Sequence, residues 1–154
     1  MGSQYWLMKS DSYFIDALKR DGQTCWEGVR NYQARNFMRD QMKVGDLALF
    51  YHSNADPSGV AGIARICKKA TPDFTAWDAK DKHFDPKASP ENPIWMMVDV
   101  AYVKKFRHFV SLHELKANPA LDGMLVLKRG MRLSIQPVEA RHFEGVKKMG
   151  QCLK

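Results

Sequence analysis

Cysteine is scarce in this sequence, and its scarcity excludes two classes of small protein. Cys25, Cys67 and Cys152 are odd in number and lack CxxC spacing, which argues against a disulfide framework and against a zinc knuckle. We therefore expect no metal and no cofactor. A reducing, intracellular compartment is the simplest interpretation, meaning the cytoplasm, or the nucleus in a eukaryote.

Long apolar runs and short catalytic motifs are also missing. No apolar stretch approaches the roughly 18 residues of a membrane span, and residues 1–6 contain no signal-peptide core. Trp6 stands where myristoylation would need Ser or Thr. GxSxG, HExxH and Walker motifs are absent, and the five histidines have no metal-ligand spacing. These absences favour a non-catalytic protein with no membrane partner.

The chain does carry an excess of positive charge. Lysine and arginine number 24 against 17 aspartates and glutamates, which gives a formal net charge of +7. That balance favours an anionic partner such as nucleic acid. The basic residues are scattered along the chain rather than gathered in a tail. Charge alone therefore does not locate a site.

The order of predicted elements is typical of a mixed α+β fold. Apolar runs of strand length cover 5–8, 47–51, 60–67 and 94–106. Helices are expected over 13–20 and 31–42, after a capping box formed by Ser111 and Glu114, and from Pro137 onward. No repeat or linker divides the 154 residues, so one domain over residues 1–154 is expected.

Residues 71–93 show no sustained periodicity and predict a long irregular loop. Loops of this length are functional more often than chance allows. Its aromatic and basic residues could flank a bound strand: Trp77, Lys80, Lys82, Phe84 and Lys87. The loop's aromatic residues could equally serve only to pin it to the rest of the fold.

The segment 26–36 is the most unusual stretch, because it places an indole, a phenol, two guanidinium groups and several carboxamides within eleven residues. On a helix over 31–42, Ala34, Met38 and Met42 would face the core. The other side would present Asn, Gln and Arg, with Trp26 upstream on a loop. Carboxamides bond base edges, arginines contact phosphates, and an indole stacks on bases. A plain amphipathic helix with a solvated polar face explains the same spacing.

Short polar side chains follow two of the predicted strands. Lys9 and Ser10 follow the first strand, and His52, Ser53 and Asn54 follow the strand over 47–51. Strand ends and the loops after them are common positions for binding groups. A helix cap near Ser10 and a structural histidine at position 52 are the alternatives without a ligand.

Four stretches carry a family resemblance. They are WEGVRNYQARN at 26–36, FYHSN at 50–54, FDPK at 84–87 and RLSIQPV at 132–138. Together they resemble the EVE domain, a PUA-like family related to the YTH domain. The resemblance spans nearly the whole chain. It implies an α+β fold built as a single PUA-like mixed β-barrel with flanking helices, which binds DNA or RNA and accepts a modified base in an aromatic pocket.

That resemblance allows the site residues to be assigned by position. Trp26 is expected to form one wall of the pocket. The predicted base-pocket residues are Ser10, Trp26, Asn31, Asn36, Tyr51, His52, Ser53 and Asn54. The predicted phosphate contacts are Lys9, Arg30, Arg35, Arg39 and Arg132.

Two enzyme classes remain as alternatives. PUA-like relatives of the ASCH type include small amidohydrolases, and Lys9, Ser10 or His52 beside a base pocket could cleave an acylated base. A metal-dependent nuclease would use Asp73 and Glu114. Its chemistry needs the acids on strands around one metal, whereas the capping box places Glu114 in a helix.

Overall fold

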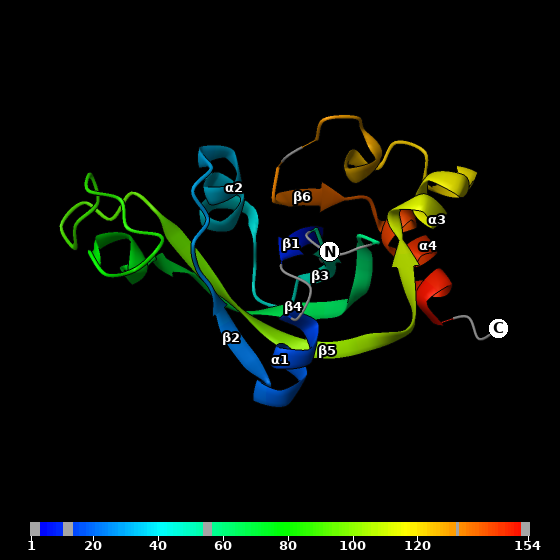
Figure 1. Cartoon of the computed structure of the whole chain (residues 1–154), viewed down its shortest axis with the longest axis horizontal. Coiled ribbons are helices and arrows are strands. Elements are labelled where there is room, and N and C mark those ends of the chain that lie inside the picture. The colour runs from blue at the N-terminus through cyan, green and yellow to red at the C-terminus, as the bar shows by residue number, and fades with distance from the viewer. Residues whose placement is uncertain (1–3, 11–13, 54–56, 132, 152–154) are drawn as a thin grey trace.

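A mixed six-stranded sheet forms the centre of the molecule. The computed structural model describes residues 4–10, 14–53, 57–131 and 133–151. The strands are β1 (Tyr5–Ser10), β2 (Gln23–Trp26), β3 (Leu47–His52), β4 (Gly59–Pro72), β5 (Met96–Ser111) and β6 (Ile135–Val138). Their order is β2-β5-β4-β3-β1-β6 (Figure 1). β1 and β3 run parallel, and the other neighbouring pairs are antiparallel.

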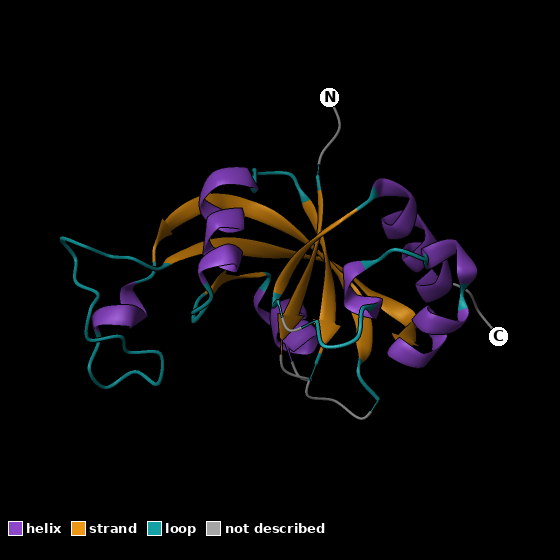
Figure 2. Ribbon diagram, turned by 90° about the horizontal axis from the view of Figure 1, so that it is seen from above, coloured by secondary structure: helices purple, strands orange, loops and turns teal. Residues whose placement is uncertain are grey.

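The helices lie around this sheet. They are α1 (Phe14–Asp21), α2 (Tyr32–Asn36), α3 (Leu112–Ala117) and α4 (Ala140–Gln151), with a π-helical turn η1 (Phe37–Gln41) and 3₁₀ turns η2 (Phe74–Trp77), η3 (Pro119–Leu121) and η4 (Leu125–Leu127). Figures 1 and 2 show α3 and α4 at one end of the long axis and the loop over 73–95 at the other. In the described residues, no helix has both the length and the apolar character that crossing a membrane requires.

β1 separates two hydrophobic cores. Trp6 and Met8 belong to the core that also contains residues of α1 and α2, whereas Leu7 belongs to the core that contains residues of α3 and α4. Successive side chains of a strand point to opposite faces. A register slip of one residue would therefore exchange the two sets of side chains, so burial on both faces fixes the position of β1.

The ends of the sheet approach each other without pairing. Within the described residues, β2 and β6 stand at opposite ends of the strand order. Three strands separate β2 from β1, yet Trp26 of β2 and Ser10 of β1 line the same cavity. The sheet therefore curls into an open barrel, and the gap between its ends is hollow.

Most predicted elements are present, but two positions differ from expectation. Trp26 ends the strand β2 rather than lying on a loop. Pro137 does not begin the last helix, because it pairs with Trp6 inside β6 and α4 starts at Ala140. β6 is an end strand of the sheet, where the missing N–H of proline is tolerated.

The helix expected over 31–42 changes character halfway. α2 ends at Asn36, and the next turn is wider, since the amide of Met42 donates to the carbonyl of Phe37 at 2.9 Å. Such π turns are uncommon and occur often at functional sites. The capping box of Ser111 and Glu114 at the start of α3 is confirmed.

The irregular connection between β4 and β5 has its own small core. It covers residues 73–95 and contains the turn η2 and an isolated bridge between Ser89 and Asn92. Ala76, Ala88 and Trp95 are buried together, with Trp77 and Ile94 packed against them. The loop is therefore a packed unit that can hold side chains in fixed positions.

Candidate nucleic-acid interface

A cavity of about 530 Å³ opens between β1 and β2. Its volume lies in the range of small-ligand sites. We call it the β1–β2 cavity. The lining comes from four separate segments: Lys9, Ser10, Thr24, Cys25, Trp26, Glu27, Gly28, Val29, Arg30, Lys82, His83 and Ser134. It combines an aromatic wall with hydroxyl and charged groups.

Trp26 supplies the aromatic wall. The side chain is 6% exposed, and its ring lies 5.4 Å from the ring of Phe50 in the hydrophobic core. It also lines the β1–β2 cavity. Core packing therefore holds the indole in place before any ligand arrives, which lowers the entropic cost of binding.

Gly28 and His83 form the part of the cavity that faces the loop. Gly28 has a φ of +84°, and a Cβ atom at this position would lie 2.5 Å from the imidazole of His83. The ring therefore lies directly against the glycine backbone. The amide of Gly28 also donates to the carboxylate of Asp73 at 2.8 Å. Only glycine allows this approach of the loop to the cavity.

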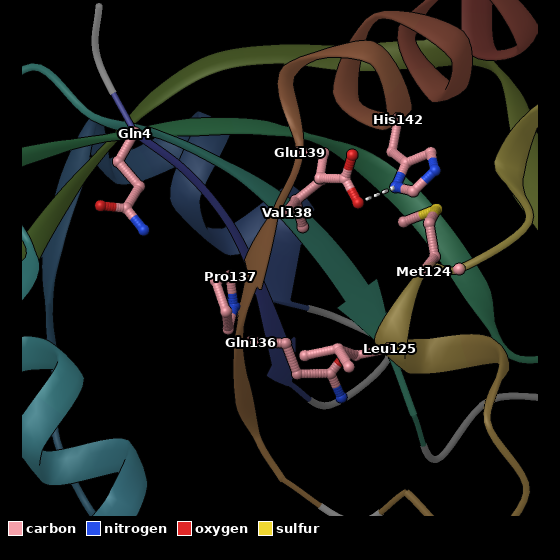
Figure 3. A pocket seen from close by; sticks show the side chains of 9 residues that line it. Gln4, Met124, Leu125, Gln136, Pro137, Val138, Glu139 and His142 are labelled. Carbon is pink, nitrogen blue, oxygen red and sulfur yellow. Dashed lines mark ion pairs between the residues drawn. The ribbon is translucent and has the colours of Figure 1, made fainter.

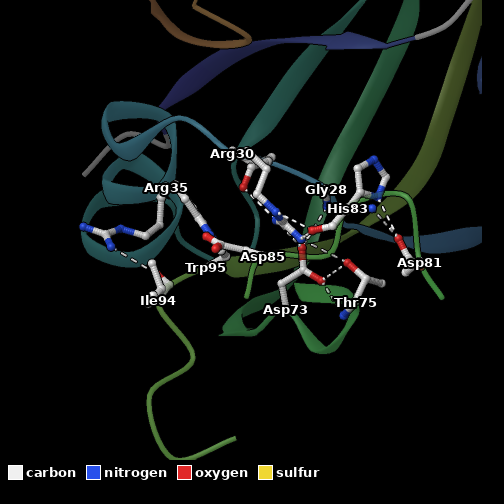
Figure 4. A network of polar contacts seen from close by, with 11 residues as sticks. Gly28, Arg30, Arg35, Asp73, Thr75, Asp81, His83, Asp85, Ile94 and Trp95 are labelled. Atoms are coloured by element: carbon white, nitrogen blue, oxygen red, sulfur yellow. Dashed lines mark hydrogen bonds and ion pairs between the residues drawn. The ribbon is translucent and has the colours of Figure 1, made fainter. Parts of the chain in front are cut away.

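Arg30 joins the loop over 73–95 to the segment that follows β2 by a set of hydrogen bonds, which we call the Arg30 lock (Figure 4). Its Nε and Nη2 donate to the carbonyl of His83 at 2.9 and 2.7 Å, and its Nη1 donates to the carbonyl of Val29 and the carboxylate of Asp73. A further bond reaches Oγ1 of Thr75 at 3.3 Å. These contacts use all five N–H groups of a guanidinium. The predicted phosphate contact of Arg30 would have to replace one of them.

Asp73 is the acceptor at the centre of this lock. It is fully buried and accepts bonds from Thr75, Gly28 and Arg30. Burial opposes the charge, but the bonds outweigh it and hold the pKa of Asp73 below its usual value. The carboxylate therefore serves to hold the loop and the segment after β2 together. Together with Glu114 in its capping box, this leaves the nuclease alternative without its acids.

Lys9 also borders a second cavity, of about 520 Å³. Its Nζ donates to the carbonyl of Met131 at 3.1 Å and lies 5.8 Å from the ring of Tyr51. We call this cavity the basic groove. Its lining is Lys9, Tyr51, Leu112, Lys116, Val126, Leu127, Lys128, Arg129, Gly130 and Met131. Four of these residues are basic and none is acidic, which suits an anionic chain.

Lys116, Lys128 and Arg129 were not among the predicted phosphate contacts. All three are exposed. The Lys128-Arg129 pair could have been noticed from its place just before the motif at 132–138. Lys116 could not, because only the fold brings α3 beside that segment.

The predicted strand-end residues divide between two places. Ser10 lines the β1–β2 cavity, and the amide of Ser53 donates to its carbonyl at 3.0 Å. Tyr51 lines the basic groove instead. His52 is buried with its ring 6.2 Å from that of Phe109. Asn54 and Arg132 fall outside the described residues.

His52 has the surroundings of a neutral core histidine. Burial lowers its pKa, the nearby carboxylate of Asp16 opposes that effect, and Lys105 adds to it. His52 does not line the β1–β2 cavity. Its contact with a base stays a prediction.

The predicted residues of α2 and η1 do not line the β1–β2 cavity either. Asn31 caps α2 by accepting from the amide of Ala34 at 2.9 Å. Asn36 accepts two bonds from the guanidinium of Arg35, at 2.8 and 3.0 Å. Arg39 pairs with the exposed Asp40. The fold therefore gathers Lys9, Ser10, Trp26 and Arg30, and the other predicted residues that the structure describes lie outside the β1–β2 cavity.

A third cavity, of about 350 Å³, lies against β6 and α4 (Figure 3). Its lining includes Glu139 and the buried His142, whose Nε2 lies 3.0 Å from the carbonyl of Asp122. Among the residues that the structure describes, no lysine or arginine lines it. A phosphate chain would not be favoured there, so the β1–β2 cavity and the basic groove remain the candidate site.

Comparisons with known proteins identify the family and the fold. Residues 4–149 match the family described as the EVE domain. Human thymocyte nuclear protein 1 is 43% identical over 164 residues, which cover 94% of this chain and 72% of that protein. A structure of the human protein in complex with 5-methylcytosine-containing DNA has a TM-score of 0.89 and 40% identity, and the match covers 99% of this chain and all of that one.

A more distant structure matches as well. The YTH domain of a Zygosaccharomyces rouxii protein, solved with N6-methyladenosine RNA, has a TM-score of 0.58 and 17% identity, with 99% of this chain and 89% of that chain covered. At this identity the likeness concerns the fold alone. The predicted PUA-like α+β fold is confirmed, with a sheet that curls but does not close.

Proposed function

The chain belongs to the EVE domain family, and we propose that it is a non-catalytic nucleic-acid-binding protein that holds one modified base in the β1–β2 cavity. The observation that carries the proposal is the preformed cavity walled by Trp26. The complex of the human relative with 5-methylcytosine-containing DNA supports both the partner and the modification.

The lining suits a single base taken out of a strand. Trp26 borders the cavity with the small part of its ring surface that the core leaves exposed, and the base would contact it there. Thr24 lies two residues earlier on β2, on the same face of the strand, and Ser10 faces it from β1. Their hydroxyls can each donate or accept a hydrogen bond at the base edge. Within the described residues β2 pairs only with β5, so its other edge borders the opening.

The basic groove gives the rest of the nucleic acid a path. Lys9 belongs to both cavities, so the two adjoin. A strand whose base enters the β1–β2 cavity would lay its phosphates along Lys116, Lys128 and Arg129. Contacts of this kind provide most of the affinity without reading sequence.

The energies set a limit on discrimination. Extracting a base costs a few kcal/mol, and stacking it on an aromatic ring returns about 1–3 kcal/mol. Burying one extra methyl group adds about 0.8 kcal/mol. We therefore expect roughly a 4-fold preference for a methylated base, rising to about 200-fold if the cavity fits the methyl closely. Affinity should be micromolar.

Substitutions in the lining test the proposal. Matched single-stranded oligonucleotides with one 5-methylcytosine or one cytosine are titrated against the parent, Trp26→Ala, Ser10→Ala and Thr24→Ala. Trp26→Ala should weaken both complexes alike, because it removes the ring surface that both bases contact. Ser10→Ala and Thr24→Ala should mainly reduce the difference in affinity between the 5-methylcytosine and the cytosine oligonucleotide.

Folding must be checked alongside, because Trp26 also belongs to the core. Trp26→Phe keeps a ring and provides a second variant if the alanine variant does not fold. A folded Trp26→Ala protein that binds like the parent would place the base elsewhere.

The proposal also excludes chemistry on the base. Acylated and methylated cytidines incubated with the protein should be recovered unchanged, as judged by mass spectrometry. Release of an acid from acylated cytidine that disappears in Lys9→Ala or Ser10→Ala would support the amidohydrolase alternative.

An intracellular location belongs to the same proposal. It is supported by Cys25 and Cys67, which are free thiols, and by the word nuclear in the name of the human relative. Microscopy of a fluorescent fusion would distinguish the nucleus from the cytoplasm.

A further inference from the structure

Tyr32 is the most exposed aromatic residue in the described part of the chain, at 56%. Its ring nevertheless has a fixed position, because it stacks on Trp95 with the ring centroids 4.7 Å apart and the planes 28° from parallel. Trp95 is 4% exposed, and its indole nitrogen donates to the carboxylate of Asp85 at 2.7 Å. A buried and hydrogen-bonded indole therefore supports an exposed phenol.

Trp95 covers one face of the Tyr32 ring, and 56% of the residue is still exposed. The guanidinium of Arg35 lies 4.9 Å from the centroid of Tyr32 and 6.0 Å from that of Trp95. If Arg35 covered the outer face of Tyr32, the one that points away from Trp95, its distance to Trp95 would approach the sum of the Arg35–Tyr32 and Tyr32–Trp95 distances. The measured distance is far smaller, so the guanidinium does not lie on the side of Tyr32 that faces away from Trp95. Its position is fixed by bonds to Asn36 and to the carbonyl of Ile94.

Tyr32 borders a cavity that none of the preceding sites uses. This cavity, of about 500 Å³, is lined by Tyr32, Arg35, Arg39, Asn92, Pro93, Ile94 and Met96. Two of these side chains are cationic and none is anionic, although Arg39 pairs with the neighbouring Asp40. An exposed aromatic face beside guanidinium groups is the combination that binds single-stranded nucleic acid.

The backbone beneath this cavity is strained. Ile94 has a φ of +56°, which is rare for a β-branched residue. Its carbonyl accepts the bond from Arg35, and the next residue is the supporting Trp95. Strain of this kind persists only where the surrounding contacts enforce it, and it is common at binding sites.

We propose that the outer face of Tyr32 is a second nucleobase subsite, on which a base flanking the one in the β1–β2 cavity stacks. The inference rests on the proposed function. Arg30 connects the two places, since it lines the β1–β2 cavity and its guanidinium lies 5.5 Å from the ring centroid of Trp95. Tyr32 follows it two residues later along the chain. A strand held in the cavity therefore passes close to the Tyr32 face.

The experiment compares single-stranded DNA oligonucleotides that each contain one 5-methylcytosine. One has normal neighbours, and two others carry an abasic nucleotide on the 5′ or the 3′ side. For the parent protein, one of the abasic positions should lower affinity by roughly 5- to 140-fold, the equivalent of one stacked base. Tyr32→Ala should bind the normal and that abasic oligonucleotide equally, while Tyr32→Phe should behave like the parent.

Phe74→Ala is the matched control, because Phe74 in the loop over 73–95 is 52% exposed but lines none of the cavities above. It should keep the parent's sensitivity to the abasic position. In a second measurement, 2-aminopurine at the sensitive position should be quenched on binding to the parent and less quenched with Tyr32→Ala. Thermal unfolding of each variant checks the fold.

The outcomes separate this inference from the proposed function. If the parent does not distinguish 5-methylcytosine from cytosine, the proposed function fails whatever Tyr32 does. If it does distinguish them, but Tyr32→Ala retains the full abasic penalty, the subsite is absent. Equal weakening of all three complexes by Tyr32→Ala would also overturn the inference, because Tyr32 would then act only by pinning the loop.

Discussion

At the scale of single residues, Gly28 shows how a backbone requirement can shape a binding site. Its left-handed conformation and the imidazole packed against it leave no room for a side chain. The loop over 73–95 can then reach the β1–β2 cavity and contribute His83 and Lys82 to its wall. A glycine inside a sequence motif is therefore explained here by contact between two distant segments.

A pair of glycine variants separates backbone strain from steric conflict. Gly22 and Gly28 have nearly the same φ, +87° and +84°, but a Cβ at Gly22 meets nothing within 4 Å. Gly22→Ala should lower the free energy of unfolding by about 1–2 kcal/mol, the cost of the left-handed conformation. Gly28→Ala should cost roughly 1–3 kcal/mol more, because the imidazole of His83 must move.

Chemical denaturation measures both variants. Adding His83→Ala should bring the cost of Gly28→Ala close to that of Gly22→Ala, since the conflict is then removed. Independent, additive effects of Gly28→Ala and His83→Ala would contradict the close packing described above.

His52 predicts how stability changes with pH. Its pKa is lowered in the folded protein by burial, so the folded state favours the neutral ring. The stabilisation is fully present above the pKa of the unfolded chain, about 6.5, and is lost as the pH falls through that value toward the folded pKa. The free energy of unfolding should therefore decrease between about pH 7.5 and 5.5. His52→Gln should flatten that part of the curve, and parallel curves for parent and variant would contradict the assignment.

At the scale of elements, the sequence predicts those whose pattern is local. The apolar runs of β1, β3 and β4, the helix α1 and the capping box of α3 are found close to their expected positions. The sequence does not predict β2, because its four residues of mixed polarity become a strand only by pairing with β5. The sequence places Pro137 at the start of a helix instead of in β6, because proline is common at the first turn of a helix and is also tolerated in an end strand.

In the candidate site, too, the residues that lie close together in the sequence are predicted and those that only the fold brings in are not. Lys9, Ser10, Trp26 and Arg30 lie near one another in two short stretches, and the fold brings them together. His83, Ser134 and the residues of the basic groove were missed, because they reach the site only through the loop over 73–95 and the segment before β6. The roles predicted for Asn31 and Asn36 remain predictions, since both side chains have partners within the helix region.

The lock formed by Arg30 should control the stability of the loop. Arg30→Lys keeps the charge but loses the planar fork, and the side chain of Arg30 is 22% exposed. We expect a loss of about 2–3 kcal/mol in the free energy of unfolding, because Asp73 stays buried with fewer donors. Hydrogen exchange followed by mass spectrometry should show faster exchange over 73–95.

Arg20→Lys is the matched control for this prediction. Arg20 also pairs with an aspartate, Asp21, but its side chain is 74% exposed. The substitution should change neither stability nor exchange measurably. A loop that exchanges at the parent's rate in Arg30→Lys would mean that the small core around Trp95 holds it without the lock.

At the scale of the whole molecule, the curl of the sheet explains why binding groups meet between its ends. A closed barrel would use the edges of β2 and β6 for hydrogen bonds within the sheet. In this fold the edges of β2 and β6 do not pair. The β1–β2 cavity is lined by side chains of β1 and of β2. The net charge of +7 then attracts an anionic chain toward that opening.

Salt dependence tests whether the basic groove carries the phosphates. On single strands, the slope of log affinity against log salt is about −0.7 for each contacted phosphate. Three or four contacts therefore predict a slope of roughly −2 to −3. Lys128→Gln with Arg129→Gln should make the slope less steep by about 1.4 and should weaken methylated and unmodified oligonucleotides equally, because phosphates carry no base information. The control pair Lys147→Gln with Lys148→Gln removes the same charge from α4, at residues that line neither the β1–β2 cavity nor the basic groove. If the control pair changes the slope as much as the groove pair, the attraction comes from net charge alone and the groove does not direct the strand.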